Sequence, residues 1–62
     1  MFRISYLDLA TNDYEQTGGF DSDKDAMEWA LKNEREGKII PLKLLVWSEY
    51  LQCYRQVDDL RA

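Results

Sequence analysis

The sequence predicts an α+β fold in the order ββαββ, with a four-stranded, mainly antiparallel sheet and one helix packed on one face. Two patterns lead to this prediction. One segment in the middle of the chain has helical periodicity and capping residues. Stretches in which apolar and polar residues alternate, as in β-strands, lie before and after it. The length of 62 residues is that of one small domain, so residues 1–62 are expected to form a single folded unit.

The first alternating stretch predicts a β-hairpin over residues 2–20. On its first strand, three large apolar side chains fall on one side: Phe2, Ile4 and Tyr6. A period of two with one apolar side is the pattern of a half-buried strand. Turn-forming Asn and Asp residues follow. The second strand, residues 14–20, contains Gly18 and Gly19, which indicate a bulge or an edge position.

Residues 22–36 carry the signals of a helix. Ser22 is a preferred N-cap, and Asp25 stands three residues later, as in a capping box. Acidic residues crowd the first turn and basic residues the last, which suits the helix dipole. Gly37 is placed to end the helix in a left-handed conformation. The apolar arc expected to face the sheet contains Ala26, Met27, Ala30 and Leu31, with Trp29 on its flank.

The most apolar stretch, residues 39–57, predicts a second hairpin whose first strand is apolar on both sides. Alternation places Ile40, Leu42, Leu44 and Val46 toward the helix, and Ile39, Pro41, Lys43, Leu45 and Trp47 away from it. A connection at residues 48–50 leads to the last strand over residues 51–57. The charged tail after that strand, residues 58–62, is expected to fray.

Two strand orders are compatible with this succession of elements. The helix can carry the chain behind the first strand, so that the third strand pairs antiparallel with the first in the order 2-1-3-4. We prefer this order because it avoids a parallel pair and keeps the glycine-containing strand at an edge. The alternative is the order 1-2-3-4, with a parallel pair in the centre of the sheet.

Charge and composition disfavour several classes of partner. The net charge of −4 works against non-specific binding to nucleic acid and to anionic membranes. No apolar run approaches the roughly 20 residues that span a bilayer, and the N-terminus lacks a signal-peptide pattern. With one cysteine and no export signal, the expected compartment is the cytoplasm.

Catalytic and metal-binding patterns are missing, so we expect no enzymatic activity, no cofactor and no metal. The chain contains no histidine. Asp21, Asp23 and Asp25 have the spacing that opens an EF-hand loop, but Ala26 and Lys32 stand where that loop needs Gly and Glu. Acidic side chains are favourable at the N-terminus of a helix, which explains why these three residues lie there. The one cysteine, Cys53, has no histidine to act as its base and is expected to be a buried structural thiol.

The aromatic pattern of the second hairpin is the strongest indication of function. Four residues are expected on the face that the helix leaves uncovered, or at the connecting turn: Leu45, Trp47, Tyr50 and Tyr54. Trp and Tyr are enriched in interface cores, so these residues are candidates for binding a protein partner or a second copy of the chain. The alternative is that they form partly exposed cross-strand pairs that only stabilise the sheet.

The leading hypothesis is therefore a small, acidic, non-catalytic module that binds a protein or itself. Its size and acidity would suit an accessory protein of a bacterium or a phage. An aromatic sheet face also suggests single-stranded nucleic-acid binding, although the RNP pattern is absent. Residues 31–62 carry six basic and five acidic residues, which leaves this alternative open. Residues 1–30 carry seven acidic and two basic residues, which raises a further alternative, an acidic inhibitor that mimics DNA.

Overall fold

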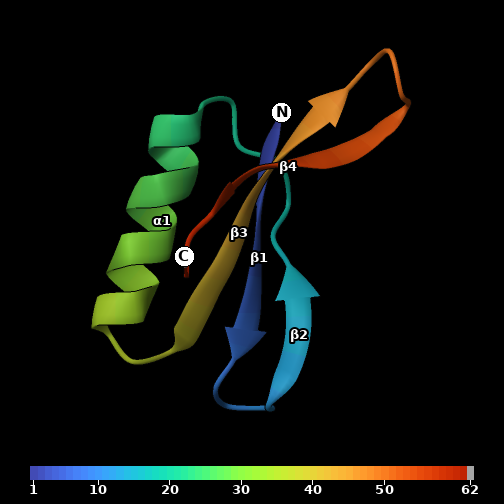
Figure 1. Cartoon of the computed structure of the whole chain (residues 1–62). Coiled ribbons are helices and arrows are strands. Elements are labelled where there is room, and N and C mark those ends of the chain that lie inside the picture. Colours follow the sequence, from blue (N-terminus) through green and yellow to red (C-terminus); the bar gives the residue numbers. More distant parts are fainter. Residues whose placement is uncertain (62) are drawn as a thin grey trace.

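The computed structural model describes residues 1–61 and confirms the ββαββ order (Figure 1). The elements are β1 (Phe2–Asp8), β2 (Asp13–Gln16), α1 (Asp23–Arg35), β3 (Ile39–Ser48) and β4 (Cys53–Asp59). All strand pairs in the sheet are antiparallel, and the strand order is β2-β1-β3-β4, which is the order preferred from the sequence. Helix α1 packs against β3 and β1 on one face of the sheet.

Helix α1 begins and ends at the predicted residues. The Ser22 hydroxyl accepts a hydrogen bond of 3.1 Å from the Asp25 N–H, which satisfies one of the free donors of the first turn. At the other end, Gly37 has a φ of 75°, in the left-handed region that glycine adopts without strain. Its N–H donates to the Glu34 carbonyl at 3.0 Å, and the helix closes there.

The core lies between α1 and the two central strands. Four buried side chains form its central cluster: Ile4, Ala26, Ala30 and Leu44. The two alanines are four residues apart and therefore lie on one side of the helix, where their small size lets the helix backbone approach the sheet. Leu31 was expected in the buried arc but is half exposed, because it lies about 100° around the helix from Ala30.

The second strand is shorter than predicted and lies at an edge of the sheet. Its ladder ends at Gln16, and the hydroxyl of the next residue, Thr17, accepts a hydrogen bond of 3.0 Å from the Ile4 N–H in place of a backbone carbonyl. The chain then passes the two glycines and pairs with β1 again at Phe20. There the backbones of Phe2 and Phe20 exchange two hydrogen bonds, of 2.8 and 2.7 Å.

A β-bulge interrupts β3 at Leu42. On β1, Ser5 pairs with Lys43, but the next residue, Tyr6, pairs with Pro41, so Leu42 has no partner across this pair of strands. A proline cannot donate to a ladder, and a bulge is one of the places where a sheet tolerates it. An extra residue on one strand also shifts the side-chain alternation by one position.

This shift corrects the predicted orientation of the first half of β3. Ile39 and Pro41, expected to face away from the helix, are buried, and Pro41 lies beside Met27 and Ala30 of α1. Ile40, expected to face the helix, lies on the opposite side and is only half-buried. After the bulge, β3 keeps the predicted alternation, with Leu44 in the core.

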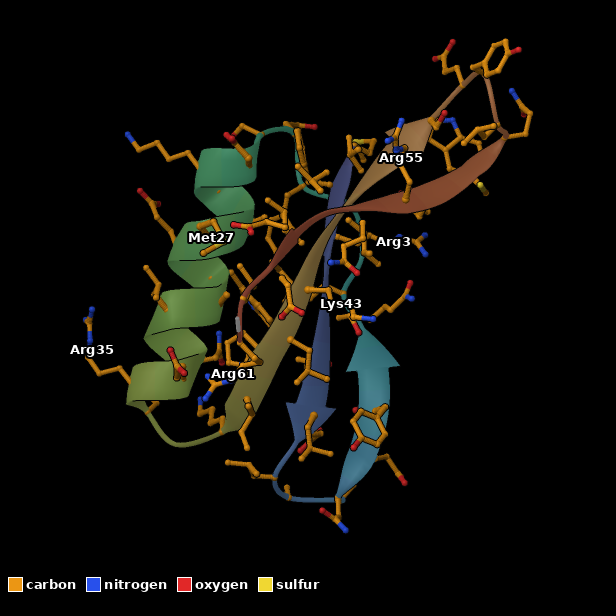
Figure 2. All side chains as sticks on the ribbon, viewed as in Figure 1. Arg3, Met27, Arg35, Lys43, Arg55 and Arg61 are labelled. Atoms are coloured by element: carbon orange, nitrogen blue, oxygen red, sulfur yellow. The ribbon has the colours of Figure 1, made fainter. Side chains whose placement is uncertain are left out.

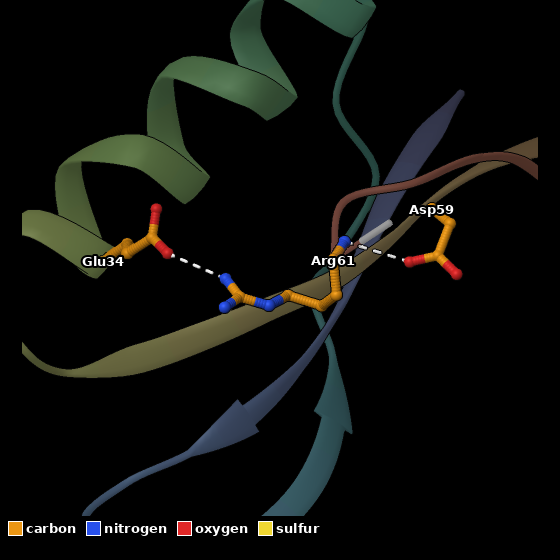
Figure 3. Close-up of polar contacts among 3 residues, drawn as sticks. All are labelled: Glu34, Asp59 and Arg61. Atoms are coloured by element: carbon orange, nitrogen blue, oxygen red, sulfur yellow. Dashed lines mark hydrogen bonds and ion pairs between the residues drawn. The ribbon is translucent and has the colours of Figure 1, made fainter.

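The charged tail is held against the helix, which corrects the expectation that it frays; its last residue, Ala62, lies outside the described residues. β4 continues to Asp59, and the Leu60 N–H donates to a β3 carbonyl at 2.8 Å. Leu60 then packs against the core. Arg61 forms an exposed ion pair of 3.1 Å with Glu34, and its N–H donates to the Asp59 carboxylate at 3.0 Å (Figure 3). The apolar contact of Leu60 explains the order, since exposed ion pairs contribute little.

The bulge leads to a prediction for two neighbouring isoleucines. Ile39→Ala should lower the free energy of unfolding by about 3 kcal/mol, because the side chain is buried and its truncation removes most of its apolar contacts. Ile40→Ala should lower the free energy of unfolding by no more than half of that amount, because this side chain is already in partial contact with water. Urea denaturation of both variants measures the difference. If Ile40→Ala is the more damaging change, the uninterrupted alternation is correct and the bulge is not.

Candidate functional site

The hairpin formed by β3 and β4 projects beyond the rest of the molecule. Its tip extends past the first turn of α1 and away from β1 and β2 (Figure 1). The connecting loop, Glu49–Gln52, is closed by its own hydrogen bonds. The Ser48 hydroxyl accepts from the Leu51 N–H at 3.1 Å, and the Gln52 side-chain amide donates to the Glu49 carbonyl at 2.6 Å. The tip is therefore a defined turn, one residue longer than the connection predicted.

Large apolar side chains are exposed along this hairpin. Tyr50 at the tip is 95% exposed, and Leu51 beside it is 54% exposed. Trp47 on β3 and Val57 on β4 are also exposed. Within residues 1–61, four of the eight large hydrophobic side chains that are exposed belong to the hairpin, so solvent-exposed apolar surface is concentrated there.

Three of the four predicted contact residues lie on the face of the sheet opposite α1. Trp47 and Tyr54 form a cross-strand pair with their ring centroids 5.3 Å apart and an angle of 67° between the rings. Leu45 pairs with Arg3 of β1. The fourth residue, Tyr50, lies at the tip rather than on this face. The structure thus brings Leu45, Trp47 and Tyr54 together.

Arg3 covers the centre of this outer face. Its guanidinium carbon lies 4.3 Å from the centroid of the Tyr54 ring, a cation–π geometry. Because β3 separates β1 from β4, the Arg3 side chain must cross β3 to reach this ring. Figure 2 shows Arg3 on the side of the strands away from α1. Leu45, which pairs with Arg3, is consequently only 8% exposed. Leu45 faces away from the helix as predicted, yet it offers almost no surface to a partner.

Cys53 is exposed, which overturns the expectation of a buried thiol. It pairs with Ser48 at the start of β4, next to the tip loop. Alternation does place it on the helix side of the sheet, opposite in direction to Trp47. At this end of the hairpin, however, there is no helix to cover that side (Figure 1). Leu51 and Val57 are also exposed, because Leu51 lies in the tip loop and Val57 at a bulge of β4.

A groove of about 620 Å³ lies at the opposite end of the sheet, between α1 and β1. Its apolar lining comes from Tyr6, Leu9, Trp29 and Ile39, and its polar lining includes Asp8, Asn33 and Lys38. The Tyr6 and Trp29 rings meet edge to face, with centroids 5.3 Å apart. The Leu9 N–H donates to the Lys38 carbonyl at 3.0 Å, which ties the end of β1 to the segment after α1. Sequence reasoning did not find this groove, because its residues come from distant parts of the chain.

Three carboxylates lie beside this groove. Glu15 pairs with Tyr6, and Asp13 pairs with Asp8, so all three acids share the Tyr6 side of the β1–β2 pair. A hydrogen bond with the Asp8 carboxyl, together with partial desolvation and the charges of Asp8 and Asp13, raises the pKa of Glu15. Burial, with the charges of Glu15 and Asp8, raises the pKa of Tyr6. Neither of the two ion pairs found within residues 1–61 involves these three acids.

The described residues provide no group of three His, Cys, Asp or Glu side chains placed to hold a metal ion. No helix in residues 1–61 is long and apolar enough to cross a membrane. No protein-family model matches the chain, and no curated protein or solved structure matches it significantly. The function therefore has to be inferred from the residues of this chain alone.

The carboxylate cluster leads to a prediction of pH-dependent stability. The pKa of Glu15 is higher in the folded state, so stability falls as the pH rises through that value and the repulsion among the acids develops. Glu15→Gln should therefore raise the melting temperature at pH 7. The gain should disappear at a pH low enough to protonate Glu15 in both the folded and unfolded states.

Thermal unfolding followed by circular dichroism at the two pH values provides the measurement. Glu49→Gln in the tip loop is the matched control, because it removes the same charge away from the cluster. A Glu15→Gln variant that melts no higher than Glu49→Gln at pH 7 would show that the three acids do not destabilise the fold.

Proposed function

We propose that this chain is a non-catalytic protein-binding module whose contact surface is the β3–β4 hairpin. The observation that carries the proposal is the concentration of exposed apolar side chains on the one segment that projects from the body. The proposed contact residues are Trp47, Tyr50, Leu51 and Val57. Tyr54 packs against Trp47 from the neighbouring strand, whereas Leu45 is buried and is not a proposed contact residue.

Burial of these side chains would be favourable. Fully burying a large apolar side chain contributes roughly 1.5–3 kcal/mol relative to leaving it in water. Tyr and Trp combine a large apolar area with a polar group at one end, which is why they dominate the binding energy of many interfaces. A hairpin whose tip loop is closed by its own hydrogen bonds is also already ordered, so little conformational entropy would be lost on binding.

The free edge of β4 offers a second kind of contact. Among residues 1–61, β4 has a neighbouring strand on the side of β3 alone, so backbone N–H and C=O groups on its other side are available to an added strand. Val57 forms a bulge, and Asp58 and Asp59 follow it. Bulges and charges protect an edge against pairing. A partner strand is therefore expected along the half nearer the tip, at residues 53–56.

The chemistry of the hairpin supports binding rather than catalysis. The charged side chains nearest its tip, Glu49 and Arg55, are exposed and take part in neither of the two ion pairs found within residues 1–61. The Cys53 thiol has no histidine to act as a base. An exposed free thiol stays reduced in the cytoplasm, which is the compartment we propose. Single-stranded nucleic acid is less well supported, because Arg3 already occupies one face of the Tyr54 ring that a base would stack on.

Replacement of the tip residues tests the proposal. The double variant Tyr50→Ser/Leu51→Ser should lose association while keeping its melting temperature, since both side chains are largely exposed. Tyr14→Ser is the matched control, because Tyr14 is a 75% exposed aromatic residue on β2, at the other edge of the sheet. Sedimentation equilibrium measures self-association of the three proteins over a range of concentrations.

A partner of different sequence requires a second measurement. A photo-reactive phenylalanine analogue placed at position 50 in the native host should form a discrete cross-linked product, whereas the same analogue at position 14 should not. The proposal fails if the wild-type chain is monomeric at all concentrations and positions 50 and 14 give the same cross-linking pattern.

A further inference from the structure

We infer that the groove between α1 and β1 is a second binding site, and that it takes an arginine or lysine side chain from a basic segment of a partner protein. This site is separate from the hairpin. Ile39, which lines the groove, is the first residue of β3, whereas the hairpin tip follows its last residue, Ser48. At roughly 3.3 Å per residue, the two ends of this ten-residue strand lie about 30 Å apart.

The aromatic lining of the groove suits the stem and the head of a long basic side chain. Trp29 and Tyr6 are both half-buried and meet edge to face, and Leu9 beside them is 45% exposed. Arginine and lysine side chains lay their methylene groups along such apolar surface. Their cationic ends are attracted to aromatic rings, and tryptophan is the strongest partner of this kind.

The charge beside the groove is unbalanced and negative. Asp8 lines the groove, and Glu15 and Asp13 lie next to it on the same side of the sheet. The one basic residue in the lining, Lys38, has its ammonium nitrogen 3.1 Å from the Glu36 carboxylate. Asp8 is the carboxylate in the lining, and Asp13 and Glu15 pair with the lining residues Asp8 and Tyr6. A cation in the groove would therefore be attracted directly by Asp8 and at longer range by its two acidic neighbours, and its charge would reduce the repulsion among them.

The shape of the groove favours a side chain of a protein segment over a free small molecule. Small-molecule sites usually enclose 70–90% of the ligand surface, whereas this groove is open to solvent. Strand β2, which carries Asp13 and Glu15, is an edge strand with all four residues exposed. The backbone of a basic segment can lie along this exposed strand while one side chain enters the groove.

A titration with a defined peptide tests this inference. The capped pentapeptide Gly-Leu-Arg-Leu-Gly is added to ¹⁵N-labelled protein, and the two tryptophan indole N–H signals are followed by NMR. The Trp29 signal should shift and saturate at millimolar peptide, while the Trp47 signal stays in place. The same peptide with citrulline in place of arginine has nearly the same shape without the charge, and it should bind about tenfold more weakly.

Protein variants test which carboxylates attract the arginine peptide. Asp8→Asn/Glu15→Gln should weaken binding of the arginine peptide by about tenfold, or roughly threefold for each carboxylate removed. Asn at position 8 can still accept the hydrogen bond of 2.9 Å that the Asp8 carboxylate receives from the Ala10 N–H, so the turn is preserved. Asp21→Asn/Glu49→Gln is the control, because it changes the net charge equally but away from the groove, and it should bind like the wild type.

Several results would overturn the inference. Equal binding of the arginine and citrulline peptides would show that charge plays no role. Equal weakening of binding in both double variants would show that only the net charge of the protein matters, not the carboxylates beside the groove. A shift of Trp47 instead of Trp29, or no shift at all, would rule out the groove. Equal binding of N-acetylarginine amide would assign the groove to a free organic cation. A Trp29 shift that depends on protein concentration without peptide would mean that a second copy of the chain fills it.

Discussion

Ile4 of β1 and Leu44 of β3 are cross-strand neighbours, and together they pack on two alanines of α1. The helix is thereby fixed on the central pair of strands. A helix of 13 residues is about 20 Å long, whereas a strand of ten residues, such as β3, is about 33 Å long. The helix therefore cannot cover the whole of β3, and the end of the strand that carries the hairpin tip is left without a second layer.

The same placement of α1 gives the two ends of the sheet different surfaces. At one end, the uncovered hairpin exposes apolar side chains and the free edge of β4. At the other end, β2 places Glu15 beside Tyr6, whose ring meets the Trp29 ring of α1 edge to face. The central cluster of buried side chains is small, so the fold also gains from the return of the chain after β4, where Leu60 adds apolar contact. A bound partner at either end would stabilise the folded state further by mass action.

Local chemistry explains why much of the fold could be predicted. Ser22 and Gly37 mark the ends of α1 through backbone hydrogen bonds and a left-handed turn, which depend on nearby residues only. The strand order followed from the avoidance of a parallel pair and the glycines of the second strand. The orientation of the first half of β3 could not be predicted in this way. Residues 39–42 are all apolar, so either alternation buries a hydrophobic side, and the pattern cannot reveal a bulge at Leu42.

The sequence by itself determined the elements, their order and the presence of excess apolar residues on the second hairpin, because periodicity and capping are properties of neighbouring residues. Only the tertiary structure decided which of those residues meet water. Arg3, from the other end of the chain, covers Leu45; the limited length of α1 exposes Cys53; and residues from β1, α1 and β3 meet to form the groove. These outcomes depend on contacts between segments far apart in the chain, which no local pattern encodes.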